Sequence, residues 1–115
     1  MMNADAEPVV VLCTFPNAEV ARQVATALVT RRLAACVNLV PGVESVYHWQ
    51  GAVETAAEVL AVIKTTRAAY PALEAELLDR HPYEVPEVLA LPVTAGAAKY
   101  LAWMAGEVAS PSACS

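Results

Sequence analysis

Three prolines fall within the twelve residues His81–Pro92, and no other feature of the sequence limits the fold as strongly. Proline lacks a backbone N–H and has a fixed φ, so Pro82 ends any helix before it and pushes His81 towards extended geometry. Pro86 excludes a helix again a few residues further on. The apolar residues 88–91 then predict a short strand. We therefore expect a stiff, extended linker followed by the last strand of the fold.

The same linker carries one imidazole, that of His81, and two carboxylates, those of Glu84 and Glu87. When such groups lie close together they can bind a metal, transfer a proton or fix a contact between subunits. Glu84 and Glu87 are unconvincing as a catalytic pair, because the sequence around them supplies no hydrophobic pocket that would raise a carboxyl pKa.

The composition predicts one soluble domain that hides part of its surface in an oligomer. The chain has 115 residues, of which 57% are apolar, whereas ordinary soluble proteins have about 45–50%. It has no uninterrupted apolar run of the ~18 residues that a membrane span needs, so we expect no membrane partner. Contact between copies of the chain is the alternative way to bury this excess of apolar residues.

The net charge is −5, and the basic residues form no cluster, so we expect no nucleic-acid partner.

The cysteines and the chain ends predict a cytoplasmic location. The three cysteines Cys13, Cys36 and Cys114 are odd in number, and the acidic, polar residues 1–8 do not resemble a secretory signal. We therefore expect reduced thiols. Residues 1–8 and 108–115 are predicted to be disordered tails on either side of a single domain at residues 9–107.

Hydrophobic periodicity and turn residues divide the domain into strands and helices. The predicted order is a strand at 9–14, a helix from 18 to about 33, a strand at 36–49 broken or bulged by Pro41-Gly42, a strand at 53–65, a helix ending at His81, a strand at 88–91 and a helix at 97–107.

This order predicts an α+β fold: a ferredoxin-like βαββαβ sandwich with an antiparallel sheet and an extra C-terminal helix. In such a sheet the first and third strands are central, and both carry continuous apolar runs here. The second and fourth strands are edges, where their prolines are tolerated. The second and third strands form an unusually long hairpin with Tyr47 and Trp49 near its tip. The helices of one domain cannot cover this hairpin, so we expect another molecule to do so.

Several motifs resemble the CutA family of divalent-cation-tolerance proteins. They are Val11-Leu12-Cys13-Thr14, Leu33-Ala34-Ala35-Cys36-Val37-Asn38, Pro41-Gly42-Val43-Glu44-Ser45, Tyr47-His48-Trp49-Gln50-Gly51 and His81-Pro82-Tyr83-Glu84-Val85-Pro86-Glu87. The resemblance implies the ferredoxin-like fold, a tight homotrimer built like the trimeric PII signalling proteins, a cytoplasmic location, and a role in the tolerance of metals such as copper. Strand pairing between subunits would cover the hairpin. The interface residues that we expect are Tyr47, Trp49, Tyr83, Pro86 and Trp103.

The resemblance also implies metal ligands. The family pattern of one cysteine and two adjacent histidines falls on Cys13, Arg80 and His81. Arginine stays cationic and cannot ligate, so either Glu84 replaces it or the ligands come from two subunits. Two structural alternatives stay open: Cys13 as a small hydrophobic side chain in a buried strand, and His81 as a hydrogen-bonded residue at a helix end.

Three functions are compatible with these residues. The first is a non-enzymatic homotrimer that binds copper or another divalent cation, without an organic cofactor. The second is a signalling module that takes a small anion in a cleft between subunits, where Lys64 would lie with Glu58, Trp49 or Glu84, and where Arg67 and Arg80 would neutralise the anion. The third is an enzyme, which we do not expect: the chain has no glycine-rich phosphate loop, no H-E-x-x-H and no nucleophile elbow, and Thr65-Thr66-Arg67 is better explained as a helix cap.

Overall fold

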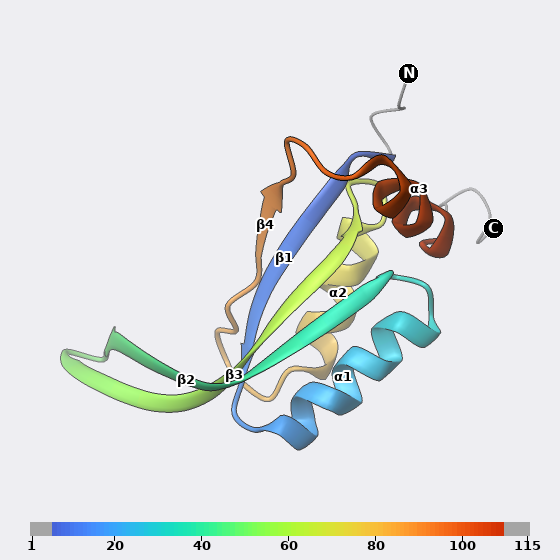
Figure 1. The fold of residues 1–115 in the computed structure, drawn as a ribbon. Coiled ribbons are helices and arrows are strands. Elements are labelled where there is room, and N and C mark those ends of the chain that lie inside the picture. Colours follow the sequence, from blue (N-terminus) through green and yellow to red (C-terminus); the bar gives the residue numbers. More distant parts are fainter. Residues whose placement is uncertain (1–5, 110–115) are drawn as a thin grey trace.

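The computed structural model describes residues 6–109, which form an α+β domain of one four-stranded antiparallel sheet and three helices (Figure 1). In chain order the elements are β1 (Pro8–Phe15), α1 (Ala18–Thr30), β2 (Cys36–Trp49), β3 (Ala52–Thr66), α2 (Tyr70–Arg80), β4 (Leu89–Pro92) and α3 (Ala98–Glu107). The predicted order of strands and helices is confirmed. No helix in this described part is long and apolar enough to cross a membrane.

The strand order in the sheet is β2-β3-β1-β4. The first and third strands are therefore central and the second and fourth are edges, as the apolar runs and the prolines predict. The β2–β3 register shifts between Val40 and Val43, where Gly42 adopts a φ of +76° that side chains rarely allow. The predicted bulge at Pro41-Gly42 is confirmed.

Local sequence signals set most helix ends. The Asn17 side chain accepts a hydrogen bond from the Val20 backbone N–H at 2.9 Å and so caps α1. The helix ends at Thr30 and not near residue 33 as predicted, because Arg32 adopts a φ of +59° and turns the chain out of the helix. Pro71 lies in the first turn of α2, and His81 has extended geometry after its last turn, as predicted.

Helices α1 and α2 cover one face of the sheet and enclose the core (Figure 1). Its buried residues are Val11, Cys13, Phe15, Ala21, Val24, Leu28, Ala34, Val59, Ala61, Ile63, Leu73 and Leu77. Alternate side chains on a strand point to opposite faces, so the remaining apolar residues of the strands lie on the other face. We call this second surface the open face; its apolar residues are Val10, Leu12, Val40, Leu60, Val62, Leu89 and Leu91.

Beyond the bulge, β2 and β3 leave the body of the domain as a two-stranded ribbon, residues 43–58 (Figure 1). The turn at its tip uses positive φ values at both Gln50 and Gly51, which suit the twist of a tight hairpin. The ribbon makes the domain long and narrow, with principal extents of 48 × 30 × 23 Å. The body therefore has a core of its own, whereas the ribbon has none.

The domain extends beyond both predicted boundaries. At the start, the Glu7 carbonyl accepts a hydrogen bond from the Arg67 N–H at 2.9 Å, and β1 begins at Pro8. At the end, Val108 is buried, and the Ala109 N–H donates to the Arg32 carbonyl at 2.8 Å. Residues 6–8 and 108–109 are therefore part of the domain and not of the predicted tails. The rest of those tails, with Cys114, lies outside the described residues.

Candidate functional site

The predicted metal ligands Cys13 and His81 lie at the same end of β1. Because Pro82 ends α2, the chain turns at His81 and lays the imidazole on the Phe15 ring, with ring centroids 4.7 Å apart and an interplanar angle of 19°. His81 is buried, at 8% exposure. The extended linker therefore packs against the sheet at the point where β1 ends.

Both ring nitrogens of His81 have hydrogen-bond partners. Nε2 lies 2.7 Å from the Thr14 carbonyl oxygen. A carbonyl only accepts, so Nε2 carries the proton. Nδ1 accepts a hydrogen bond from the Tyr83 backbone N–H at 3.1 Å. The imidazole is therefore held as the neutral Nε2–H tautomer, and its lone pair is already occupied.

Cys13 points into the core and is fully buried. Burial, with smaller contributions from the charges of Glu87 and Glu58, raises the pKa of its thiol to about 12. A thiol must lose its proton to ligate a metal ion. In this structure Cys13 therefore packs as a small hydrophobic side chain. This agrees with the structural alternative given for it from the sequence.

Arg80, which replaces a histidine of the family pattern, takes part in an ion-pair network between α1 and α2. Its guanidinium binds the Glu76 carboxylate, and Arg31, which directly follows α1, binds the same carboxylate at 2.6 Å. The hydrogen bond from Arg80, together with that from Arg31, holds the pKa of Glu76 below its usual value despite the opposing effect of burial. Glu84, the candidate replacement ligand, is exposed on the linker.

One contact that the sequence did not indicate joins the linker to the base of the ribbon. The Tyr83 hydroxyl donates a hydrogen bond to Glu58 at 2.7 Å. Burial, followed by this hydrogen bond, raises the pKa of Tyr83. The bond spans 25 residues of sequence, so no local pattern could have revealed it.

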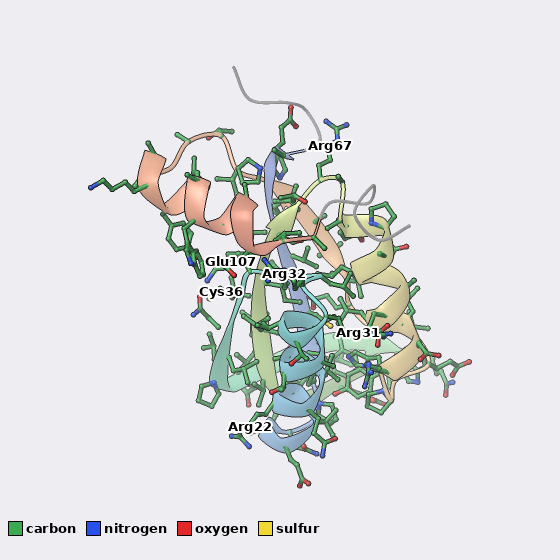
Figure 2. All side chains as sticks on the ribbon, turned by 90° about the vertical axis from the view of Figure 1, so that its right-hand side faces the viewer. Arg22, Arg31, Arg32, Cys36, Arg67 and Glu107 are labelled. Atoms are coloured by element: carbon green, nitrogen blue, oxygen red, sulfur yellow. The ribbon has the colours of Figure 1, made fainter. Side chains whose placement is uncertain are left out.

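Lys64 does not meet its predicted cleft partners within one chain. Its ammonium group donates to the Asn38 side chain and lies 3.9 Å from the Cys36 sulfur, on the open face. Figure 2 shows Cys36 below α3. Glu58 is six positions away on the same strand, or roughly 20 Å, and Trp49 lies further out along the ribbon. The alternation of side chains in β2 could have placed Cys36 and Asn38 on one face, but only the register brings Lys64 to them.

The remaining basic candidate, Arg67, pairs with Glu7 at 3.2 Å. Both line a shallow hollow of about 540 Å³ between the start of α2 and β4, which is otherwise mostly apolar. The hollow shares no residue with the Lys64 cluster, so the basic side chains proposed for anion binding do not converge in the described chain.

The predicted interface residues fall into two groups. Tyr47 and Trp49 lie on the exposed ribbon, and Trp103 lies exposed on α3 with its ring 5.6 Å from that of Tyr100. Tyr83 and Pro86 lie half-buried on the linker. Ribbon and α3 are therefore the parts that leave large aromatic surfaces exposed.

Comparison with known proteins decides the family. A sequence profile described as CutA1 divalent ion tolerance protein matches residues 9–107. The chain belongs to the CutA1 family. It is similar to the divalent-cation tolerance protein CutA of Thermus thermophilus, with 53% identity over 95 residues that cover 83% of this chain and 92% of that protein. The chloroplastic CutA 1 of Oryza sativa is 48% identical over 96 residues, or 84% of this chain, but this chain spans only 54% of that protein.

Solved CutA1 structures share the fold. The divalent cation tolerance protein of Thermus thermophilus superposes with a TM-score of 0.87 at 49% identity, over 89% of this chain and 99% of that one. CutA1 of Oryza sativa superposes with a TM-score of 0.89 at 43% identity, over 93% and 98% of the two chains.

The residues of this CutA1 chain do not fit the metal site that the family pattern implies. Within residues 6–109, no three His, Cys, Asp or Glu side chains lie close enough to share a metal ion. Firm zinc and copper sites use three or four protein ligands with available lone pairs. Here the lone pair of His81 is taken, the Cys13 thiol is buried and Arg80 is cationic. The donor set at the end of β1 therefore does not suit a divalent cation.

Proposed function

We propose that this CutA1 chain forms a homotrimer of PII-like architecture on its ferredoxin-like domain and acts in divalent-cation tolerance by binding cations such as copper, without catalysing a reaction. The assembly rests on one observation, the ribbon. Val46 and Val53 are 64% and 71% exposed, and Tyr47 and Trp49 lie exposed beside them. A ribbon of two strands with no core is marginally stable at best in water, so another surface has to cover it.

The open face and the edge strands offer that surface. The open face carries apolar side chains on all four strands, and Leu89 and Leu91 of β4 are 56% and 43% exposed. Unpaired edge strands such as β2 and β4 can pair with a strand from another chain. The ribbon of one subunit packed against the open face and an edge of the next would bury apolar surface on both sides, and three copies close such a head-to-tail contact into a ring.

The cation-binding part of the proposal rests on the family, whose relatives are named for divalent-cation tolerance. One chain supplies no three-ligand group within residues 6–109. We therefore place the cation between subunits, where ligands from two chains can meet. Glu84 is the predicted ligand that stays exposed and can reach a neighbouring subunit. The family name supports a non-enzymatic role, because it denotes tolerance and names no reaction.

The small-anion alternative has weaker support. Arg67 and Arg80 are paired with carboxylates, and Lys64 binds the Asn38 amide. An anion would have to compete with these partners, and nothing in the described residues gathers the three cations into one place.

The assembly can be tested with two matched variants. Val53→Glu places a charge on the ribbon, and Leu78→Glu places the same charge on the outer surface of α2, where Leu78 is 50% exposed. Sedimentation velocity of the wild type and of Leu78→Glu is expected to show trimers, and Val53→Glu to show monomers or unfolded chain. Identical sedimentation of all three proteins as trimers would exclude the ribbon from the interface.

Cation binding can be tested by calorimetric titration of the wild-type protein with Zn²⁺ and Cu²⁺. Binding of one ion per chain at saturation is expected, because a ring of three subunits has three equivalent two-chain sites, and Glu84→Gln should weaken it. A titration without heat beyond dilution would remove the cation-binding part of the proposal and leave the assembly untouched.

A further inference from the structure

We infer that neither the thiolates of Cys13 and Cys36 nor the imidazole of His81 ligates divalent cations in this chain: Cys13 and His81 lie in a closed, hydrogen-bonded contact at the end of β1, and Cys36 lies beside an ammonium group. This goes beyond the proposed function, because it says which donors do not take part, and it holds whether or not the chain assembles into trimers.

The first argument is the geometry of His81. A metal-bound imidazole needs one ring nitrogen with an available lone pair, while the other donates to a nearby acceptor. Here Nε2 donates to the Thr14 carbonyl at 2.7 Å, so Nδ1 is the only nitrogen with a lone pair. That lone pair accepts from the Tyr83 backbone N–H at 3.1 Å. Ligation would break this bond and displace the linker that starts at His81.

The second argument is access. The Phe15 ring stacks on one face of His81, and the Tyr83 ring lies 4.8 Å from it at an angle of 51°. The Cys13 sulfur is fully buried in the core. A cation with bonds of about 2.0–2.3 Å to sulfur and nitrogen would need these aromatic rings to move apart.

The third argument is Arg80. A histidine at this position would offer a third donor, but the Arg80 guanidinium pairs with Glu76 one turn earlier in α2. Arg31, which follows α1, binds the same carboxylate. In this chain the family position therefore takes part in an ion-pair network and offers no donor to a cation.

The fourth argument concerns the other described cysteine. The sulfur of Cys36 is half-exposed and lies 3.9 Å from the Lys64 ammonium and 3.9 Å from the Asn38 amide nitrogen. These groups direct hydrogen-bond donors or a positive charge at the sulfur, and each of them disfavours a cation bound to the same atom.

Cobalt absorption tests the inference directly, because thiolate ligation of Co²⁺ gives an intense charge-transfer band that oxygen ligands do not give. Titration of the reduced wild-type protein with Co²⁺ is expected to give no such band. A band that saturates with added Co²⁺ and disappears in Cys13→Ala or Cys36→Ala would overturn the inference. The test begins with the unaltered protein, and the two variants are needed only if a band appears.

Affinity gives a second test. The Zn²⁺ dissociation constant of Cys13→Ala/Cys36→Ala is expected to stay within about twofold of the wild-type value, because no ligand has been removed. A loss of about tenfold or more would overturn the inference. If neither protein binds Zn²⁺, the inference about the thiols stands and the cation-binding part of the proposed function fails, so the two failures are distinguishable.

His81→Ala distinguishes a structural role of the imidazole from a role as a metal ligand. If the role is structural, the Zn²⁺ dissociation constant should stay unchanged and the midpoint of thermal unfolding should fall by at least about 4 °C, since two hydrogen bonds to buried groups are lost. If His81 is a ligand, Zn²⁺ binding should weaken, and the midpoint measured without metal should change little. That second result would also overturn the inference.

Discussion

The body and the ribbon of this chain share strands β2 and β3, but the two regions are stabilised in different ways. In the body, β1 and β3 bury their alternate side chains under α1 and α2, and Ile63 and Leu73 are fully enclosed. In the ribbon, the same strand β3 continues past Glu58 with no helix on either side, and Val53 is 71% exposed. The body is stabilised by contacts within the chain, whereas the ribbon depends on contacts that one chain cannot make.

This difference separates two kinds of mutation. A change in the body should lower the stability of every subunit and leave the number of copies unchanged. A change in the ribbon should weaken the assembly, so its effect should grow as the protein is diluted. The base of the ribbon, where Tyr83 of the linker bonds Glu58, is where the two regions meet.

The largest effect is expected in the body. Leu73→Ala removes a fully buried side chain from α2 and should lower the free energy of unfolding by about 2–5 kcal/mol, through lost burial and the cavity left behind. Urea unfolding at fixed protein concentration measures it. Leu78→Ala, on the exposed side of the same helix, is the control and should cost less than about 0.5 kcal/mol. Equal losses in both variants would mean that α2 does not face the core as described.

Trp49→Ala is expected to have the next largest effect, on assembly. A buried aromatic side chain at the centre of an interface commonly contributes about 2–4 kcal/mol, so the concentration at which the oligomer dissociates should rise by at least about tenfold. Light scattering over a dilution series gives this concentration. A variant that stays assembled to the same dilution as the wild type would show that Trp49, 37% exposed in the single chain, remains outside the interface.

Tyr83→Phe tests the link between body and ribbon. It removes only the hydroxyl that donates to Glu58, and the loss of a hydrogen bond to a charged group should cost about 1–3 kcal/mol. Hydrogen exchange at residues 56–60 should become faster, because the base of the ribbon loses its attachment to the linker. Unchanged exchange there would show that the bond does not hold the two regions together.

Glu76→Gln should have the smallest effect. The pKa of Glu76 is lowered in the folded state, so its contribution is present above the ordinary value of 4.5 and is lost as the pH falls through the lowered value. At pH 7 the variant should be less stable by about 0.5–1 kcal/mol, as is typical of exposed ion pairs. Unfolding measured from pH 7 down to strongly acid solution should show this difference disappear. A difference independent of pH would exclude the ion pair as its cause.

The sequence predicts the fold well where the signals are local. Apolar runs and prolines identified the central and edge strands, Pro41-Gly42 marked the bulge, and Pro82 marked the end of α2. The end of α1 was predicted three residues too late, since its stop depends on a positive φ at Arg32, a residue type that does not signal one.

The candidate site was harder to predict, because its decisive contacts involve backbone groups and distant residues. The family resemblance pointed to Cys13 and His81, but the Thr14 carbonyl and the Tyr83 N–H that bind the imidazole are backbone groups, which no residue type reveals. Likewise, the partners of Lys64 depend on the β2–β3 register, which is set by the bulge and the turn together. A pattern of residue types identifies candidate ligands, and the register and hydrogen bonds decide whether they are available.

The mass of the wild-type protein in solution tests the central claim most directly. The single chain has a mass of 12.1 kDa, and light scattering at micromolar concentration should give three times this value, because the exposed ribbon needs neighbouring copies to cover it. A stable, monodisperse species with the mass of one chain would contradict the account, since the ribbon would then persist in water without a partner.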